Sequence, residues 1–299
     1  MQIPFPAARN SISTLFTPLM EQPGATWGGS SNDAAFGRVH ASLFSPGHAA
    51  KRAEAMAEFL GSLDLAVSRA TRAWLQTGWQ MAVANANAVL GYGAEDHCLM
   101  RVVQPRKGVG EEEDVPMAGT SQVQSRPQIQ SPDLEGSVAL MAATSDVVYR
   151  RFGDPNVYPY LHASLVFLRY LSAFPAAMYH VQGSYPWKLL SQMLNTLLPS
   201  GSSRIEGEEF PREASSLPLS EDYALRGLLW TADYFPDDWF AGQVDDDERG
   251  FEAPSMTEHR KERVRWLACR LAQSGRFLTY ADGRFGVAEE YDVEVAPSQ

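Results

Sequence analysis

The 299-residue sequence contains only two cysteines, Cys98 and Cys269. Two cysteines are too few for a disulfide framework or, on their own, for a zinc site, and we therefore expect a protein of a reducing, intracellular compartment. The N-terminus has no basic segment followed by an apolar one, so we expect no secretory signal. The longest apolar stretch, residues 161–171, is about half as long as a membrane span. We interpret it as a buried helix and expect no membrane association.

Positive charge is also scarce. The chain has 25 Lys and Arg residues against 36 Asp and Glu residues, which gives a net charge of −11. Such a chain repels phosphate backbones on average, so any contact with nucleic acid requires a local basic patch. Hydrophobic residues make up 44% of the sequence and aromatic residues 11%, which is enough for a buried core and excludes disorder of the whole chain.

Sequence motifs of catalysis are missing. The six histidines show no HExxH or HxH spacing, there is no CxxC, phosphate-binding glycine loop or G-x-S-x-G turn, and neither cysteine has a motif around it. The acidic strings Asp237-Asp238 and 245–248 lie side by side in expected loops, whereas a two-metal site needs carboxylates that converge from separate elements. We therefore predict no enzyme, no metal site and no cofactor. His162, on an apolar helix, is interpreted as a satisfied core or boundary histidine and not as a ligand.

Helical periodicity dominates the sequence, and strand-like alternation is rare. Leu65 is expected to face inward, and either a packing reason or a local break is expected at Gly78, because glycine inside a helix is unfavourable. Two short β-type runs, 276–280 and 284–287, flank a turn at Ala281-Asp282-Gly283 and predict a hairpin. The predicted helices cover residues 34–44, 46–63 (after a cap at Ser45-Pro46), 64–90, 134–152, 160–173, 184–199, 220–230 and, after a capping box at 255–258, the stretch up to Gly275.

The expected fold is therefore all-α. Antiparallel helical hairpins are stacked as an α-solenoid or bundle, with a short β-hairpin at the C-terminus. Residues 104–133 are rich in Gln, Ser, Pro and Gly, contain an acidic run and lack aromatic residues, so we predict a disordered linker there. This linker divides helical hairpins in 1–103 from a helical region in 134–299. We expect one continuous helical domain, although two separate bundles remain an alternative.

The last predicted helix carries the main group of cations. Helical spacing places them on both sides of an apolar stripe that includes Val264 and Leu267. This pattern fits an ordinary solvated helix, and it also fits a rim that contacts phosphates, with Trp266 nearby for stacking. The candidate nucleic-acid-binding residues are Arg260, Lys261, Arg263, Arg265 and Arg270.

Several short strings occur in an order that suggests a family. The string at 221–227, Glu221-Asp222-Tyr223-Ala224-Leu225-Arg226-Gly227, is followed by Trp230, Tyr234-Phe235-Pro236 and Trp239-Phe240. Further strings are Pro186-Trp187, 194–197, 260–267 and, near the N-terminus, 4–9 and 38–44. In this order they resemble the DNA/RNA-binding helical domain shared by the ever-shorter-telomeres telomerase subunit and the SMG nonsense-mediated-decay factors, in its fungal form. The resemblance covers nearly the whole chain apart from the predicted linker.

Physical reasoning assigns these strings an architectural role. Arg226 is expected to be partly buried and to pair with a carboxylate or with loop carbonyls. The pairs Phe235-Pro236 and Trp239-Phe240 are expected to pack the turn that follows onto the preceding helix.

The resemblance implies a non-enzymatic DNA/RNA-binding or scaffold protein that acts in telomere maintenance or mRNA surveillance, in the nucleus, the cytoplasm or both. The implied partners are single-stranded RNA or telomeric DNA and the proteins of a decay or telomerase complex. Family members usually carry an N-terminal TPR region that resembles 14-3-3 proteins, and this sequence begins just after the point where that region would end. A fragment, a partial gene model or a degenerate, truncated paralogue is therefore expected. The alternative is a helical-repeat protein-interaction module that binds no nucleic acid.

Overall fold

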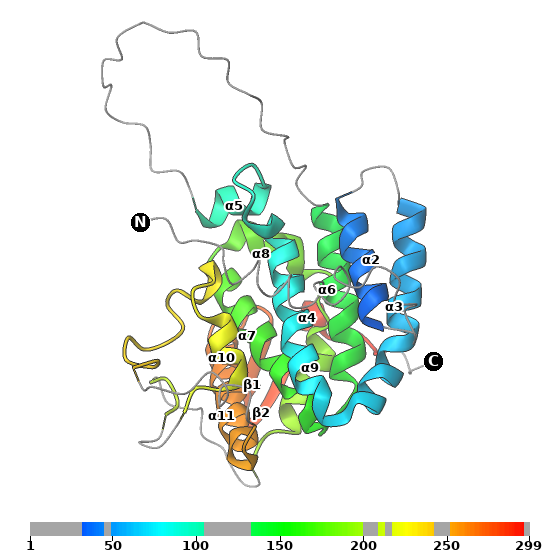
Figure 1. The fold of residues 1–299 in the computed structure, drawn as a ribbon. Helices are drawn as coiled ribbons and strands as arrows, with labels where there is room; N and C mark the ends of the chain where they lie inside the picture. Colours follow the sequence, from blue (N-terminus) through cyan, green and yellow to red (C-terminus); the bar gives the residue numbers. More distant parts are fainter. Residues whose placement is uncertain are drawn as a thin grey trace, which may run out of the picture.

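The computed structural model describes residues 32–44, 49–104, 133–199, 209–212, 217–241 and 252–295. Helices dominate these residues, as predicted, and a two-stranded sheet follows the last helix (Figure 1). The helices are α2 (Asn32–Leu43), α3 (Ala49–Ala70), α4 (Trp74–Val89), α5 (Cys98–Val103), α6 (Leu134–Tyr149), α7 (Tyr158–Ser172), α8 (Pro175–Gln182), α9 (Trp187–Asn195), α10 (Ser220–Leu225) and α11 (Pro254–Ala272). Short 3-10 turns are η1 (Thr71–Ala73), η2 (Gly91–Gly93), η3 (Pro155–Val157), η4 (Leu229–Thr231) and η5 (Glu289–Tyr291), and the strands are β1 (Leu278–Ala281) and β2 (Arg284–Val287).

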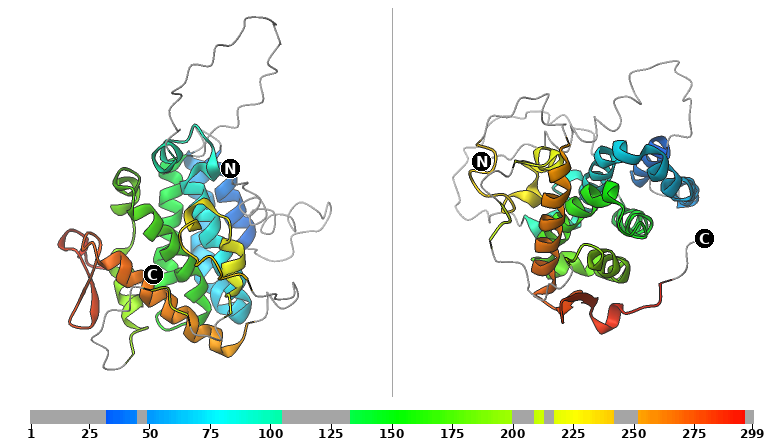
Figure 2. Two further views of the ribbon diagram at one scale, coloured as in Figure 1. Left: turned by 90° about the vertical axis from the view of Figure 1, so that its left-hand side faces the viewer. Right: turned by 90° about the horizontal axis from the view of Figure 1, so that it is seen from below.

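The helices α4 and α7 form the centre of the fold. They pack against each other, and α6 covers α4 while α11 covers α7. The pair α2 and α3 lies on one side of the bundle, next to α6, and the sheet packs against α9 and α11 (Figure 1). Figure 2 shows α11 lying across the other helices, with the hairpin projecting beyond its end. This crossing brings the C-terminal part of the chain onto the central helix α7.

The hydrophobic core takes residues from both sides of the segment 105–132. One cluster of buried side chains includes Phe36, Phe59 and Trp74 from the N-terminal part and Trp187 and Phe285 from the C-terminal part. The predicted linker itself, apart from residues 104 and 133, and the predicted cap at 45–46 lie outside the described residues.

The expected boundary between two helices at residues 63 and 64 is wrong. Helix α3 continues to Ala70, and the break falls at η1, where Thr71 has a φ of +48°. Leu65, which was expected to face inward, is 51% exposed. The buried residues of α3 are Phe59, Leu63 and Val67, spaced four apart. Leu65 is two residues from Leu63 and therefore projects from the opposite side of the helix.

Two further sequence predictions concern single helix positions. Gly78 does have a packing reason, because a Cβ atom there would lie 2.6 Å from Cζ3 of Trp74. The predicted capping box at 255–258 is wrong. The helix begins at Pro254 with Ala253 as its N-cap and no side-chain cap, since proline at the first helical position already fixes the required φ.

Helix α10 is shorter than the predicted helix 220–230. The helix ends at Leu225 because Gly227 takes a φ of +81°, and residues 229–231 form the separate turn η4.

Helices α5 and α8 were not predicted, since each is short. The hairpin is confirmed: Leu278 pairs with Val287, and Asp282 and Gly283 both have positive φ, as a tight two-residue hairpin turn requires. Within the described residues, no helix is both long and apolar enough to cross a membrane.

Candidate functional site

Glu221 lies at the centre of a buried ion-pair cluster that joins α7, α10 and α11. Its carboxylate is completely buried. It accepts hydrogen bonds from Nε of Arg260 at 2.6 Å, from Nη2 of Arg260 at 2.9 Å and from Nδ1 of His162 at 2.9 Å. Burial alone would raise the pKa of Glu221, but the charge and hydrogen bonds of Arg260 outweigh it and hold that pKa well below its usual range.

The guanidinium of Arg260 is held between two carboxylates. It is 1% exposed, and its Nη1 atom donates to Oε1 of Glu252 at 2.7 Å in addition to the bonds with Glu221. Burial lowers the pKa of Arg260, but the two carboxylates more than compensate and raise it. This double pairing satisfies a charge that would be costly to bury alone.

His162 completes the cluster from the side of α7. A carboxylate accepts only, so Nδ1 of His162 donates to Glu221, while Nε2 lies 2.6 Å from the hydroxyl oxygen of Tyr234. The expectation that His162 is a satisfied core histidine is confirmed, because the side chain is fully buried between these two partners.

The next acid along the chain, Asp222, has a different environment. Its Oδ2 atom accepts from the indole N–H of Trp239 at 3.1 Å and from the backbone N–H of Leu219 at 3.0 Å. Arg263 has its Nη1 atom 3.9 Å from Oδ2 of Asp222, and its guanidinium lies 3.7 Å from the ring centre of Phe210 and 4.5 Å from that of Trp239. Burial raises the pKa of Asp222, and the charge of Arg263 only partly opposes this.

The structure separates the five basic candidates into two groups. Arg260 and Arg263 are 1% and 2% exposed, which corrects the expectation that all five lie beside the buried stripe. They belong to that stripe, because positions 260, 263, 264 and 267 share one helix face. Among the other three, Lys261 pairs with Glu258 at 2.8 Å, Arg265 donates to the carbonyl of Leu197 and Arg270 lies over the ring of Trp266.

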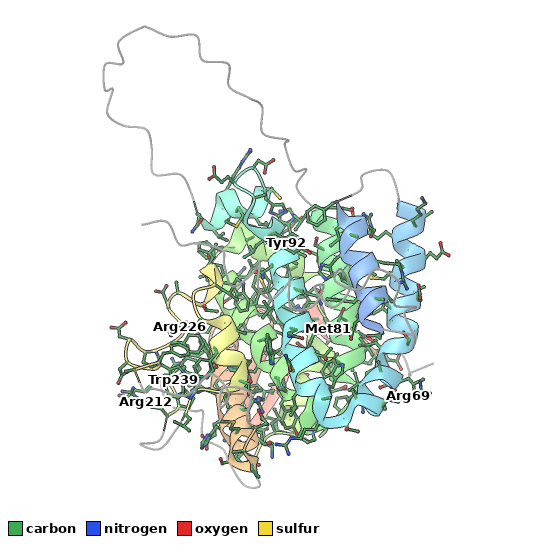
Figure 3. The ribbon with its side chains drawn as sticks, viewed as in Figure 1. Arg69, Met81, Tyr92, Arg212, Arg226 and Trp239 are labelled. Carbon is green, nitrogen blue, oxygen red and sulfur yellow. The ribbon has the colours of Figure 1, made fainter. Side chains whose placement is uncertain are left out.

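Arg226 is placed differently from the prediction. It is exposed and lies 4.8 Å from the ring centre of Phe240, instead of being partly buried beside a carboxylate. The reason is that α10 ends at Leu225, so Arg226 follows the helix rather than lying within it. Figure 3 shows Arg226 and Trp239 on the same side of the molecule, next to α10. Phe240 also contacts Tyr223 of α10, so the predicted packing of the turn onto the preceding helix is confirmed.

Further residues of the strings between 221 and 240 anchor the same region to the core. Leu225, Trp230 and Tyr234 are buried. The indole N–H of Trp230 donates to Oδ1 of Asn87 on α4 at 3.2 Å, and its ring meets Phe167 of α7 edge-on. The strings therefore fix the segment 217–241 to α4, α7 and α11. Phe235 and its neighbour Pro236 are only half-buried.

A second buried polar group was not predicted. His40 of α2 donates from Nε2 to Oδ1 of Asn85 at 3.2 Å, and its Nδ1 atom accepts from the hydroxyl of Tyr92 at 2.5 Å. Burial lowers the pKa of His40 to about 4. The only sequence signal was the unusual position of Tyr92 between two glycines, in a turn where all three residues take positive φ.

A cavity of about 770 Å³ lies elsewhere on the described surface, between the ends of α6 and α8, the start of α9 and residues 290–295. None of the cluster residues line it, and Lys188, which does, forms an ion pair with Asp292. Among the residues that the structure places, no group of three or more His, Cys, Asp and Glu side chains is arranged to hold a metal ion.

Comparisons of the chain with family models, with curated protein sequences and with solved structures found no match.

Proposed function

We propose that this chain is a non-enzymatic helical scaffold of the telomerase-subunit and decay-factor type, which binds its partners with its outer surface. One observation carries the proposal. Residues of two separate strings, Glu221 and Asp222 from one and Arg260 and Arg263 from the other, meet in a single buried cluster. If the chain has the architecture of that family, strings that are distant in the sequence must contact each other in the folded chain, as these two do.

The same cluster supports a structural role for its two buried acids and for His162. His162, Glu221 and Asp222 are fully buried, and each is hydrogen-bonded to groups of the same chain. A general acid or base must reach a substrate proton directly or through one water. These three groups instead hold α7, α10 and α11 together, which favours binding at the surface over chemistry in the interior.

Single-stranded RNA or telomeric DNA is the partner that the resemblance implies. Of the five basic candidates, Lys261, Arg265 and Arg270 keep part of their side chains at the surface, and these are the three that we propose contact phosphates. Phosphate contacts release counterions, so the affinity should be highest at low salt and fall steeply as salt is added.

Fluorescence anisotropy with labelled single-stranded RNA and telomeric-repeat DNA at about 50 mM salt tests this proposal. The variant Lys261→Glu/Arg265→Glu should weaken binding. The matched control Lys51→Glu/Arg69→Glu makes the same charge change on exposed positions of α3 and should bind like the wild type. Arg69 lies on the opposite side of the molecule from Arg226 (Figure 3). Equal losses in both variants, or no binding by the wild type, would exclude the nucleic-acid role.

A protein-interaction module is the second candidate, and a specific observation favours it. Burial of Arg260 and Arg263 removes two of the five candidate cations from the surface of a chain whose net charge is −11. Such a surface is suited to a basic protein partner. This candidate requires that the wild type bind no nucleic acid at about 50 mM salt and that a protein partner be retained in pull-downs after nuclease treatment.

A further inference from the structure

Two arginines from different helices meet at one buried tryptophan. The guanidinium carbons of Arg169, on α7, and Arg270, on α11, each lie 5.6 Å from the ring centre of Trp266. The helices α7 and α11 pack against each other along this contact. Both arginines are half-buried, and Trp266 is 5% exposed. Two cations therefore contact the same aromatic ring at the edge of the core.

The surroundings of Arg169 disfavour its charged form. Burial lowers its pKa, and the neighbouring charge of Arg270 lowers it further, while Tyr234 and the exposed carboxylate of Asp233 act in the opposite direction. Among the described residues no carboxylate forms an ion pair with Arg169, in contrast to the doubly paired Arg260. A desolvated cation next to a like charge is stabilised by a bound anion.

The tryptophan adds an unused hydrogen-bond donor. The indole Nε1 of Trp266 is buried and has no hydrogen-bond acceptor within the described part of the chain. Buried indole N–H groups normally have a partner, because leaving one unpaired costs free energy. This donor belongs to the same ring that both guanidiniums lie over, and a buried N–H and two guanidiniums are each groups that bind an oxygen-rich anion.

We infer that Arg169 and Arg270 form an oxyanion site that takes a phosphate group of single-stranded nucleic acid. Guanidinium groups bind phosphate oxygens in pairs of hydrogen bonds, and two of them on one phosphate supply both charge and orientation. The choice of a phosphodiester over a carboxylate rests on the proposed function and on the rings that continue from this point.

A continuous series of aromatic rings leads away from the arginine pair. Ring centres are separated by 6.3 Å from Trp266 to Tyr234, by 4.5 Å from Tyr234 to Phe235 and by 4.9 Å from Phe235 to Phe240. The last two rings are half-buried, and the exposed Arg226 lies over Phe240. Partly exposed rings beside phosphate-binding cations are the arrangement on which unpaired bases stack.

The test uses the full chain with two probes, inorganic pyrophosphate in calorimetry and a labelled oligouridine in anisotropy. The variant Arg169→Gln/Arg270→Gln removes both guanidiniums and leaves polar side chains. The matched control Arg38→Gln/Arg69→Gln removes two exposed arginines from α2 and α3. We expect the first variant to lose pyrophosphate binding, to bind oligouridine at least about tenfold more weakly at low salt and to reduce the salt slope by about one, while the control matches the wild type.

A melting curve separates binding from folding. The Arg169→Gln/Arg270→Gln variant should melt close to the wild type, because the cation–ring contacts that it removes are offset by relief of the repulsion between the two like charges; a large drop would assign the arginines a structural role and overturn the inference. Undiminished oligouridine binding by this variant would overturn the site but leave the proposed function standing. Pyrophosphate binding that depends on Arg169 and Arg270, without any oligouridine binding, would retain the oxyanion site and overturn the proposed function. Absence of both kinds of binding in the wild type would overturn both.

Discussion

Arg260 and Glu221, which are 39 residues apart in the sequence, form a two-point ion pair in the interior, with 2.6 Å from Nε to Oε1 and 2.9 Å from Nη2 to Oε2. Planar guanidinium and carboxylate groups match each other in this geometry, which is stronger and more directional than a single contact. The pair fixes the short helix α10 against α11, and His162 extends the connection to α7. Its loss should therefore affect the stability of the whole C-terminal region.

Replacement of the carboxylate provides the first test. Glu221→Gln leaves the buried charge of Arg260 with only Glu252 as a partner, so the free energy of unfolding should fall by about 3–5 kcal/mol. Urea unfolding followed by circular dichroism measures the change. The matched control is Glu58→Gln, which breaks an exposed ion pair with Arg38 and should cost under about 1 kcal/mol. Similar losses for both variants would contradict a special role for Glu221.

Arg263 and Arg226 both contact aromatic rings, but replacing them should lower the free energy of unfolding by very different amounts. Arg263→Ala leaves the buried acid Asp222 without its cation and removes the contacts with Phe210 and Trp239, so a loss of about 3–5 kcal/mol is expected. Arg226→Ala removes one exposed cation–ring contact and should cost no more than about 1 kcal/mol. Thermal and urea unfolding of both variants measure the difference, and a reversed order would refute the burial assigned to these residues.

The stability should depend on pH through His40. Its pKa is about 4 in the folded chain and about 6.5 when unfolded, so the unfolded state takes up a proton first as the pH falls. The neutral ring of His40 makes its full contribution to the free energy of unfolding above pH 6.5. This contribution is lost progressively as the pH falls toward 4, by a total of about 3 kcal/mol. Nuclear magnetic resonance titration of the ring gives the pKa directly. The variant His40→Gln should show a flatter pH dependence in that window, and an unchanged slope would count against the prediction.

The turn next to His97 provides a prediction with an internal control. Gly91 and Gly153 both have positive φ, but a Cβ atom on Gly91 would lie 2.4 Å from Cγ of His97, whereas one on Gly153 would meet nothing within 4 Å. Gly153→Ala should therefore cost only the backbone strain, about 1–2 kcal/mol. Gly91→Ala adds a steric clash and should cost at least about 1 kcal/mol more. Equal melting temperatures for the two variants would show that His97 moves freely out of the way.

Sequence periodicity predicted the elements that depend on local signals. The apolar stripe of α11, the hairpin turn at Asp282-Gly283 and the packing role of Gly78 are all confirmed. The end of α3 could not be placed, because nothing in its sequence marks Thr71 as the residue with positive φ. Local patterns set the type of an element more reliably than its boundaries.

The candidate site was predicted less well, for a physical reason. Arg260 and Arg263 share a helix face with Val264, but any pattern analysis counts arginine as a surface residue. Their burial is possible only because Glu221 and Asp222 approach from another helix, and no sequence spacing relates residues so far apart. The strings of the resemblance contained both halves of the cluster without indicating that they meet.

A double-mutant cycle on Glu221 and Arg260 tests the central claim most directly, namely that these residues act as one architectural unit. The free energies of unfolding of the wild type, Glu221→Gln, Arg260→Gln and the double variant give their interaction energy. We predict that the double variant is less destabilised than the sum of the single variants, by about 2–3 kcal/mol, since neither charge is left unpaired with respect to the other. Additive effects, within about 0.5 kcal/mol, would contradict the claim.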